Sequence, residues 1–163
     1  MKIIIVDDRP RYMWETIEKL KGMPVDEIVM LYFHGKFTYY PDNDNEIKQR
    51  CDDLDVSLVQ IEQSSELMKQ LDIYYAEDDT LIFMDFGLGD TDIFDDRVDI
   101  IYAKQKMSSE RFPIWFYTGT GERTVARLNR TFNNHTIPTL EFIPQKYILR
   151  LDYDYIENEI LNG

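Results

Sequence analysis

Cysteine and histidine are scarce in this chain of 163 residues, which has one cysteine and two histidines. A single cysteine excludes an intramolecular disulfide and any zinc site built on several thiolates. No apolar run approaches the roughly 20 residues of a membrane span. The apolar part of the opening MKIIIVDD is also too short for a signal peptide. We therefore expect a cytoplasmic protein without a membrane partner.

Positive charge is scarce as well. Eighteen lysines and arginines stand against 31 acidic residues, which gives a formal net charge of −13. Such a surface repels phosphate backbones, so we expect no direct contact with nucleic acid. Apolar residues make up 44% of the chain and aromatic residues 13%, enough for a substantial core. The length then predicts a single domain over residues 1–163.

Short apolar segments alternate with helical patterns along the chain. The expected strands lie at residues 2–6, 26–33, 56–62, 80–84, 112–118 and 139–144. The expected helices lie at about 11–22, 64–71, 92–106, 121–132 and 147–160. This alternation predicts an α/β domain, doubly wound, with a mainly parallel sheet and helices on both faces.

Two segments compete for the place of the second strand. Residues 26–33 and 56–62 both have the composition of a strand. A helix that starts at Ser64 or Ser65 and leads into 80–84 favours 56–62 as the regular second strand. Residues at about 34–55 would then be an insertion, which adds or covers an edge strand of the sheet.

Polar side chains follow four of the expected strands. Asp7 and Asp8 follow the first, Asp85 follows residues 80–84, and Thr118 and Lys146 follow the last two. Taken alone, each residue has an ordinary explanation. Aspartate and threonine commonly end strands or cap helices, and a lysine at a strand end usually extends its charged group into water. In parallel sheets, however, ligands bind beyond the carboxyl ends of strands where the strand order reverses. Together, these residues predict a binding site at that edge.

The three carboxylates carry the chemistry of the predicted site. If the strands before Asp7 and Asp85 are neighbours, three like charges crowd together, which is unfavourable unless a cation neutralises them. Oxygen ligands of this kind suit Mg²⁺, the usual partner of a phosphoryl group in transfer. Asp85 would attack phosphorus as a carboxylate nucleophile, while Lys146 and Thr118 would contact phosphoryl oxygens.

The ordered segments IIIVDDRP, LIFMDFGLGD, IWFYTG and FIPQK resemble the receiver domain of two-component response regulators. The resemblance implies a flavodoxin-like fold whose five-stranded sheet has the order 2-1-3-4-5. It implies that Asp7, Asp8 and Asp85 hold Mg²⁺ together with the main-chain carbonyl of Gly87.

The same resemblance implies a function. A stand-alone receiver would accept a phosphoryl group on Asp85 from a histidine kinase or a phosphotransfer protein. It would then act as a signalling switch or relay towards an unidentified downstream protein. Thr118 and Lys146 complete such a site. The implied chemistry is limited to self-phosphorylation and self-dephosphorylation at Asp85, so we expect no enzyme in the usual sense.

Two departures from the family pattern keep an alternative open. Tyr147 follows Lys146 where the family has a proline, and the aromatic of the last strand is Phe142 rather than residue 143. These departures favour a receiver-like domain that is not phosphorylated and serves as a protein-interaction module. The complete set of five polar residues at the strand ends favours the phosphorylated receiver.

Overall fold

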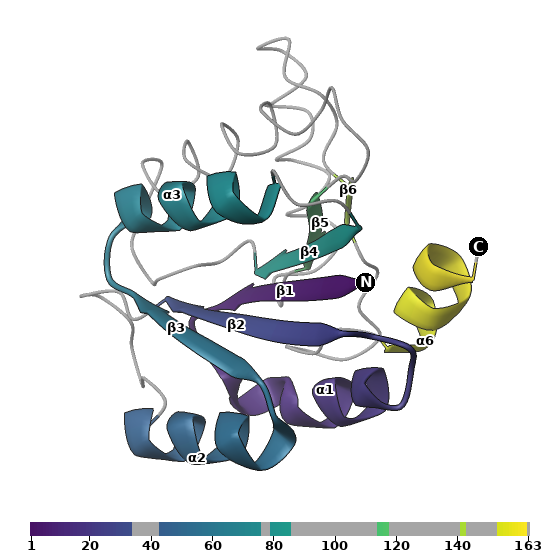
Figure 1. The fold of residues 1–163 in the computed structure, drawn as a ribbon, viewed down its shortest axis with the longest axis horizontal. Helices are drawn as coiled ribbons and strands as arrows, with labels where there is room; N and C mark the ends of the chain where they lie inside the picture. The colour runs from purple at the N-terminus through teal and green to yellow at the C-terminus, as the bar shows by residue number, and fades with distance from the viewer. Residues whose placement is uncertain (34–42, 76–78, 86–113, 118–140, 143–152, 163) are drawn as a thin grey trace, which may run out of the picture.

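A computed structural model describes residues 1–33, 43–75, 79–85, 114–117, 141–142 and 153–162. Within these ranges six strands form one sheet in which every pairing is parallel (Figure 1). The strands are β1 (Lys2–Asp7), β2 (Glu27–Phe33), β3 (Ser57–Ile61), β4 (Thr80–Asp85), β5 (Ile114–Tyr117) and β6 (Glu141–Phe142). Their order across the sheet is β3-β2-β1-β4-β5-β6.

Helices cover both faces of this sheet. The described helices are η1 (Pro10–Tyr12), α1 (Trp14–Lys21), α2 (Asp44–Leu54), α3 (Ser64–Tyr75), α6 (Tyr153–Tyr155) and η2 (Ile156–Leu161). Figure 1 shows α1 and α2 on one face of the sheet and α3 on the other. The expected α/β class, with a parallel sheet between helices, is therefore confirmed. None of the described helices has the length and apolar character needed to cross a membrane.

The sequence of β1 explains its central place. Ile3, Ile4, Ile5 and Val6 are completely buried, as expected for a parallel strand covered on both faces. Ile3 and Ile5 belong to a core cluster that also contains Met13, Ile17 and Leu20, which lie in or just before α1. Because side chains alternate along a strand, Asp7 continues the row of Ile3 and Ile5 towards this face.

The order of the second and third strands corrects the sequence-based assignment. β2, rather than β3, pairs with β1, and β3 pairs only with β2 at the edge of the described sheet. The continuous apolar run of β2 is buried at every position from Ile28 to Phe33, as a central strand requires. In β3 only Ile61 is buried. Within the described residues the sheet therefore has six strands, and the edge strand added to the expected five is β3 rather than β2.

Part of the expected insertion is regular structure. Residues 44–54 form α2, which connects the parallel strands β2 and β3. The side chain of Asn43 caps this helix by accepting hydrogen bonds from the main-chain N–H groups of Asn45 and Glu46. Asp55 ends it in the left-handed conformation, at φ 54°. Residues 34–42 and the helices expected at 92–106 and 121–132 lie outside the described residues.

The C-terminal helical segment packs on the same face of the sheet as α1. Ile156 is completely buried in the core cluster, and the ring of Tyr155 meets Trp115 of β5 edge-on at a centroid distance of 6.2 Å. The ammonium group of Lys19 lies 5.5 Å from the centre of the Tyr153 ring. The segment therefore closes the core beside β5, and its start at Tyr153 leaves the first part of the helix expected at 147–160 undescribed.

Candidate functional site

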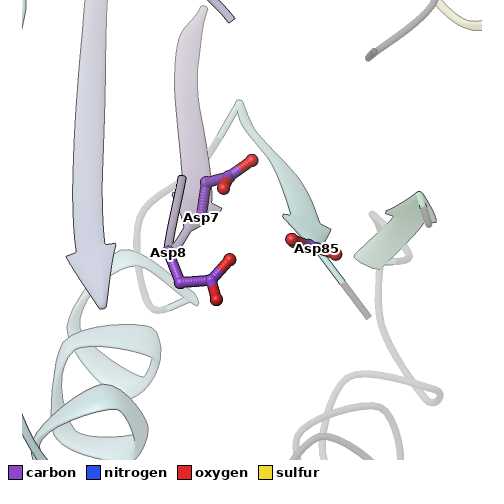
Figure 2. Close-up of side chains that lie close together, drawn as sticks. All are labelled: Asp7, Asp8 and Asp85. Atoms are coloured by element: carbon purple, nitrogen blue, oxygen red, sulfur yellow. The ribbon is translucent and has the colours of Figure 1, made fainter. Parts of the chain in front are cut away.

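Three carboxylates meet at the carboxyl ends of β1 and β4. Asp7 is the last residue of β1, Asp8 follows it, and Asp85 is the last residue of β4. Each offers an oxygen, and these oxygens all lie within 4.8 Å of one another. Figure 2 shows the carboxylates of Asp7 and Asp8 turned towards the strand that carries Asp85. The cluster lies where the chain's strand order reverses, the usual ligand position in parallel α/β sheets.

Two of these carboxylates are withdrawn from water. Asp7 is 3% exposed and Asp8 is 2% exposed, whereas Asp85 is partly exposed. Burying ionised groups costs free energy unless they are paired, hydrogen-bonded or bound to a metal. A compact set of carboxylate oxygens with one partly open member suits a hard divalent cation that retains some of its water ligands. The donor set therefore fits Mg²⁺.

Hydrogen bonds hold the Asp7 carboxylate at both of its oxygens. The main-chain N–H of Arg9 donates to Oδ1 at 2.6 Å, and the hydroxyl of Tyr117 donates to Oδ2 at 2.6 Å. Both distances are short, as expected for charge-assisted hydrogen bonds. Each carboxylate oxygen has two lone pairs, so these bonds still leave Asp7 able to contact a cation.

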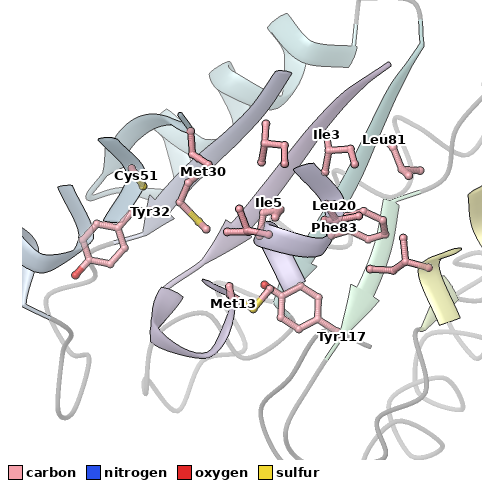
Figure 3. Packing of buried hydrophobic residues seen from close by; sticks show 14 of the residues in the cluster. Ile3, Ile5, Met13, Leu20, Met30, Tyr32, Cys51, Leu81, Phe83 and Tyr117 are labelled. Atoms are coloured by element: carbon pink, nitrogen blue, oxygen red, sulfur yellow. The ribbon is translucent and has the colours of Figure 1, made fainter. Parts of the chain in front are cut away.

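Tyr117 also belongs to the site, although it is not among the residues predicted from the sequence. It ends β5, is 3% exposed, and also places its hydroxyl 3.2 Å from the carbonyl oxygen of Val6. Figure 3 shows its ring within the core cluster that includes Ile5 and Phe83. Burial raises the pKa of Tyr117 well above its usual range, and the negative charges of nearby carboxylates raise it further. The phenol therefore stays protonated and donates.

A signal for Tyr117 existed in the sequence. It occupies the last position of an apolar run, directly before Thr118, just as Asp85 occupies the last position of its own strand. In the sheet, Tyr117 and Asp85 are paired residues of the parallel β4–β5 ladder. The hydroxyl of Tyr117 therefore lies near the same edge of the sheet as Asp85. The sequence offered as much reason to include Tyr117 in the predicted site as Thr118.

The other predicted site residues lie outside the described part of the chain. Gly87 follows β4 by two residues, Thr118 follows β5 directly, and Lys146 follows β6 by four residues. Tyr147 and Ile143, on which the alternative depends, also lie there. The structure thus brings together Asp7, Asp8 and Asp85 and leaves the roles of the others as predictions.

No protein-family model, curated protein or solved structure matches the chain. The fold and the site still define a class, a parallel α/β protein with an acidic cluster at the reversal of its strand order.

Proposed function

We propose that the protein is a receiver-type signalling domain that accepts a phosphoryl group on Asp85 in a reaction that depends on Mg²⁺. The observation that carries this proposal is the meeting of Asp7, Asp8 and Asp85 within 4.8 Å at the edge of the sheet. Asp85 is the most accessible of the three, which suits a nucleophile that must meet a phosphodonor.

The proposed transfer assigns a part to each carboxylate. An oxygen of Asp85 attacks phosphorus, the bond between phosphorus and the donor atom breaks, and an aspartyl-phosphate forms. The donor leaves with the electron pair of the broken bond, as the imidazole of a phosphohistidine does after taking a proton. A bound Mg²⁺ would supply charge neutralisation for the phosphoryl oxygens. Asp7 and Asp8 would hold that ion beside Asp85, with the Gly87 carbonyl as a further ligand.

The strand order supports this proposal. If the edge strand β3 is set aside, the remaining order β2-β1-β4-β5-β6 is the order 2-1-3-4-5 that the receiver resemblance implies. β3 then takes the place of the extra edge strand. Thr118 and Lys146 would contact the phosphoryl oxygens, since each follows one of the last two strands in sequence.

The full six-strand order also occurs in dinucleotide-binding α/β folds, which makes these the main competing class. Those folds need a glycine-rich turn after the first strand, so that main-chain N–H groups can approach a pyrophosphate. Here the turn after β1 contains Asp8, Arg9 and Pro10, and Asp7 ends the strand itself. Two buried carboxylates at that position repel a pyrophosphate, so the site favours a cation instead.

The proposal implies a cytoplasmic protein whose donor is a histidine kinase or a phosphotransfer protein. A small phosphodonor tests it without knowledge of that partner. We expect intact-mass spectrometry after incubation with acetyl phosphate and Mg²⁺ to detect one acid-labile phosphoryl group. The adduct should be absent from Asp85→Asn and when a chelator removes Mg²⁺. The matched control Asp52→Asn, at an exposed acid of α2, should react normally.

Two results would contradict the phosphorylated receiver. One is a lack of any adduct on the folded protein at saturating Mg²⁺, which would leave the non-phosphorylated interaction module as the better account. The other is an adduct that persists in Asp85→Asn, which would place the acceptor at another residue.

A further inference from the structure

The phenol of Tyr117 connects two strands that are not neighbours. Tyr117 ends β5, whereas Asp7 ends β1, and β4 lies between these strands. Adjacent strands are about 4.8 Å apart, so the span from β1 to β5 is about 10 Å. The long side chain of Tyr117 covers most of this span and brings its hydroxyl to 2.6 Å from Oδ2 of Asp7.

We propose that Tyr117 is a positioning residue, which fixes the Asp7 carboxylate in the orientation that a divalent cation needs. This role rests on the proposed function. It adds that Tyr117, a residue outside the acidic cluster, controls how tightly the cluster binds the metal. Tyr117 acts through Asp7 and takes no part in the transfer itself.

The surroundings of Asp7 explain why it needs such a partner. Asp7 continues the row of Ile3 and Ile5, so its carboxylate extends from an apolar face of the sheet at 3% exposure. Water reaches it poorly, and protein groups must supply its hydrogen bonds. The donor from Arg9 is a main-chain N–H, which any residue except proline supplies at position 9. The donor from β5 exists only if residue 117 carries a hydroxyl at the right distance.

A second contact of the phenol supports the same role. Its hydroxyl also lies 3.2 Å from the carbonyl oxygen of Val6, next to Asp7 in the chain. Because the phenol has a single proton, Oδ2 of Asp7, the closer oxygen, is its main acceptor, and the Val6 carbonyl is a weaker second acceptor.

Isothermal titration with Mg²⁺ on the full chain tests the inference. We expect Tyr117→Phe to bind Mg²⁺ about tenfold more weakly, because partners of metal ligands typically contribute a factor of 10–100 in affinity. The matched control is Tyr32→Phe, which removes the hydroxyl of another buried tyrosine that bonds an aspartate, Asp44, at 3.1 Å. Its affinity for Mg²⁺ should equal that of the wild type.

A second readout separates positioning from a purely structural role. In acetyl phosphate labelling, Tyr117→Phe should raise the half-saturating Mg²⁺ concentration about tenfold and recover the wild-type rate at saturating Mg²⁺. A structural defect would instead lower the labelling rate at every Mg²⁺ concentration, including saturating Mg²⁺. Circular dichroism checks that each variant is folded. Tyr117→Met, which is smaller and more flexible than tyrosine and lacks a hydroxyl, replaces the phenylalanine variant if that variant does not fold.

The outcomes distinguish this inference from the proposed function. Equal Mg²⁺ affinities of wild type and folded Tyr117→Phe overturn the positioning role, even if Asp85 is phosphorylated. A tenfold loss of affinity without any labelling of the wild type supports the positioning role and contradicts phosphoryl transfer. A wild type that does not bind Mg²⁺ overturns both.

Discussion

The stability of the protein should depend on divalent cations more steeply than on ionic strength. Three ionised carboxylates with oxygens within 4.8 Å of one another repel each other by at least about 3.5 kcal/mol per pair at an effective dielectric constant of about 20. A bound divalent cation adds attractions to each carboxylate that outweigh the repulsion between them. At a Mg²⁺ concentration about 100 times the dissociation constant, binding stabilises the folded state by about 2.7 kcal/mol. For a chain of this length, that raises Tm by about 5–10 °C.

Thermal unfolding followed by circular dichroism measures this effect. Sodium chloride at matched ionic strength controls for screening, which weakens repulsion between partly exposed charges but acts little on buried ones. We expect Asp8→Ala to lose most of the Mg²⁺-dependent increase in Tm and to bind Mg²⁺ at least about tenfold more weakly. Its unfolding free energy without Mg²⁺ should change less than its metal binding. The control Asp52→Ala should keep the full increase.

The reasoning would be refuted by equal Tm increases in Mg²⁺ and in matched sodium chloride. It would also be refuted if Asp8→Ala kept the wild-type response, since the cation would then bind elsewhere on this acidic surface.

Three further predictions concern buried residues outside the acidic cluster. Tyr117→Phe should lower the unfolding free energy in urea by about 2 kcal/mol, the value of one hydrogen bond to a charged group, and Tyr32→Phe by less; equal losses would contradict this. Phe83→Ala should cost about 3–5 kcal/mol because Phe83 is completely buried, while a loss under 1 kcal/mol would contradict its central place. Burial raises the pKa of the Cys51 thiol to about 11, so Cys51 should react with a thiol reagent at pH 8 only after unfolding. Fast labelling of the folded protein would contradict the burial. Because the pKa of Cys51 is raised on folding, the stability that this shift contributes is present below pH 9.0, the ordinary value, and is lost as pH rises towards 11.

The sequence predicted the core of the sheet through local patterns. The run Ile3–Val6 is continuously apolar and β-branched, and such runs form central parallel strands. Because the strands are parallel, acids directly after two adjacent strands must meet at one edge. Asp7, Asp8 and Asp85 do meet there.

The prediction that residues 56–62 form the regular second strand is wrong, because a helix directly after a strand does not determine the strand's place in the sheet. The run from Ile28 to Phe33 is apolar at every position, which is the pattern of a strand covered on both faces. Residues 57–61 contain Ser57 and Gln60, both exposed, as expected at an edge. The polar content of each strand was therefore the better guide to its place.

The contact between Tyr117 and Asp7 could not be predicted from strand ends alone. It depends on how far β5 lies from β1 across the intervening β4, a distance that the sheet order sets and that no local pattern encodes. The roles of Gly87, Thr118 and Lys146 remain predictions because these residues lie outside the described part of the chain.

A crystal structure of the protein grown with Mg²⁺ and beryllofluoride, a mimic of the phosphoryl group, tests the central claim most directly. We predict density for the mimic bonded to a carboxylate oxygen of Asp85, with a cation in contact with Asp7 and Asp8 at about 2.1 Å. Density for the mimic or the cation at another place, or an acidic cluster that stays free of both at saturating concentrations, would contradict the account.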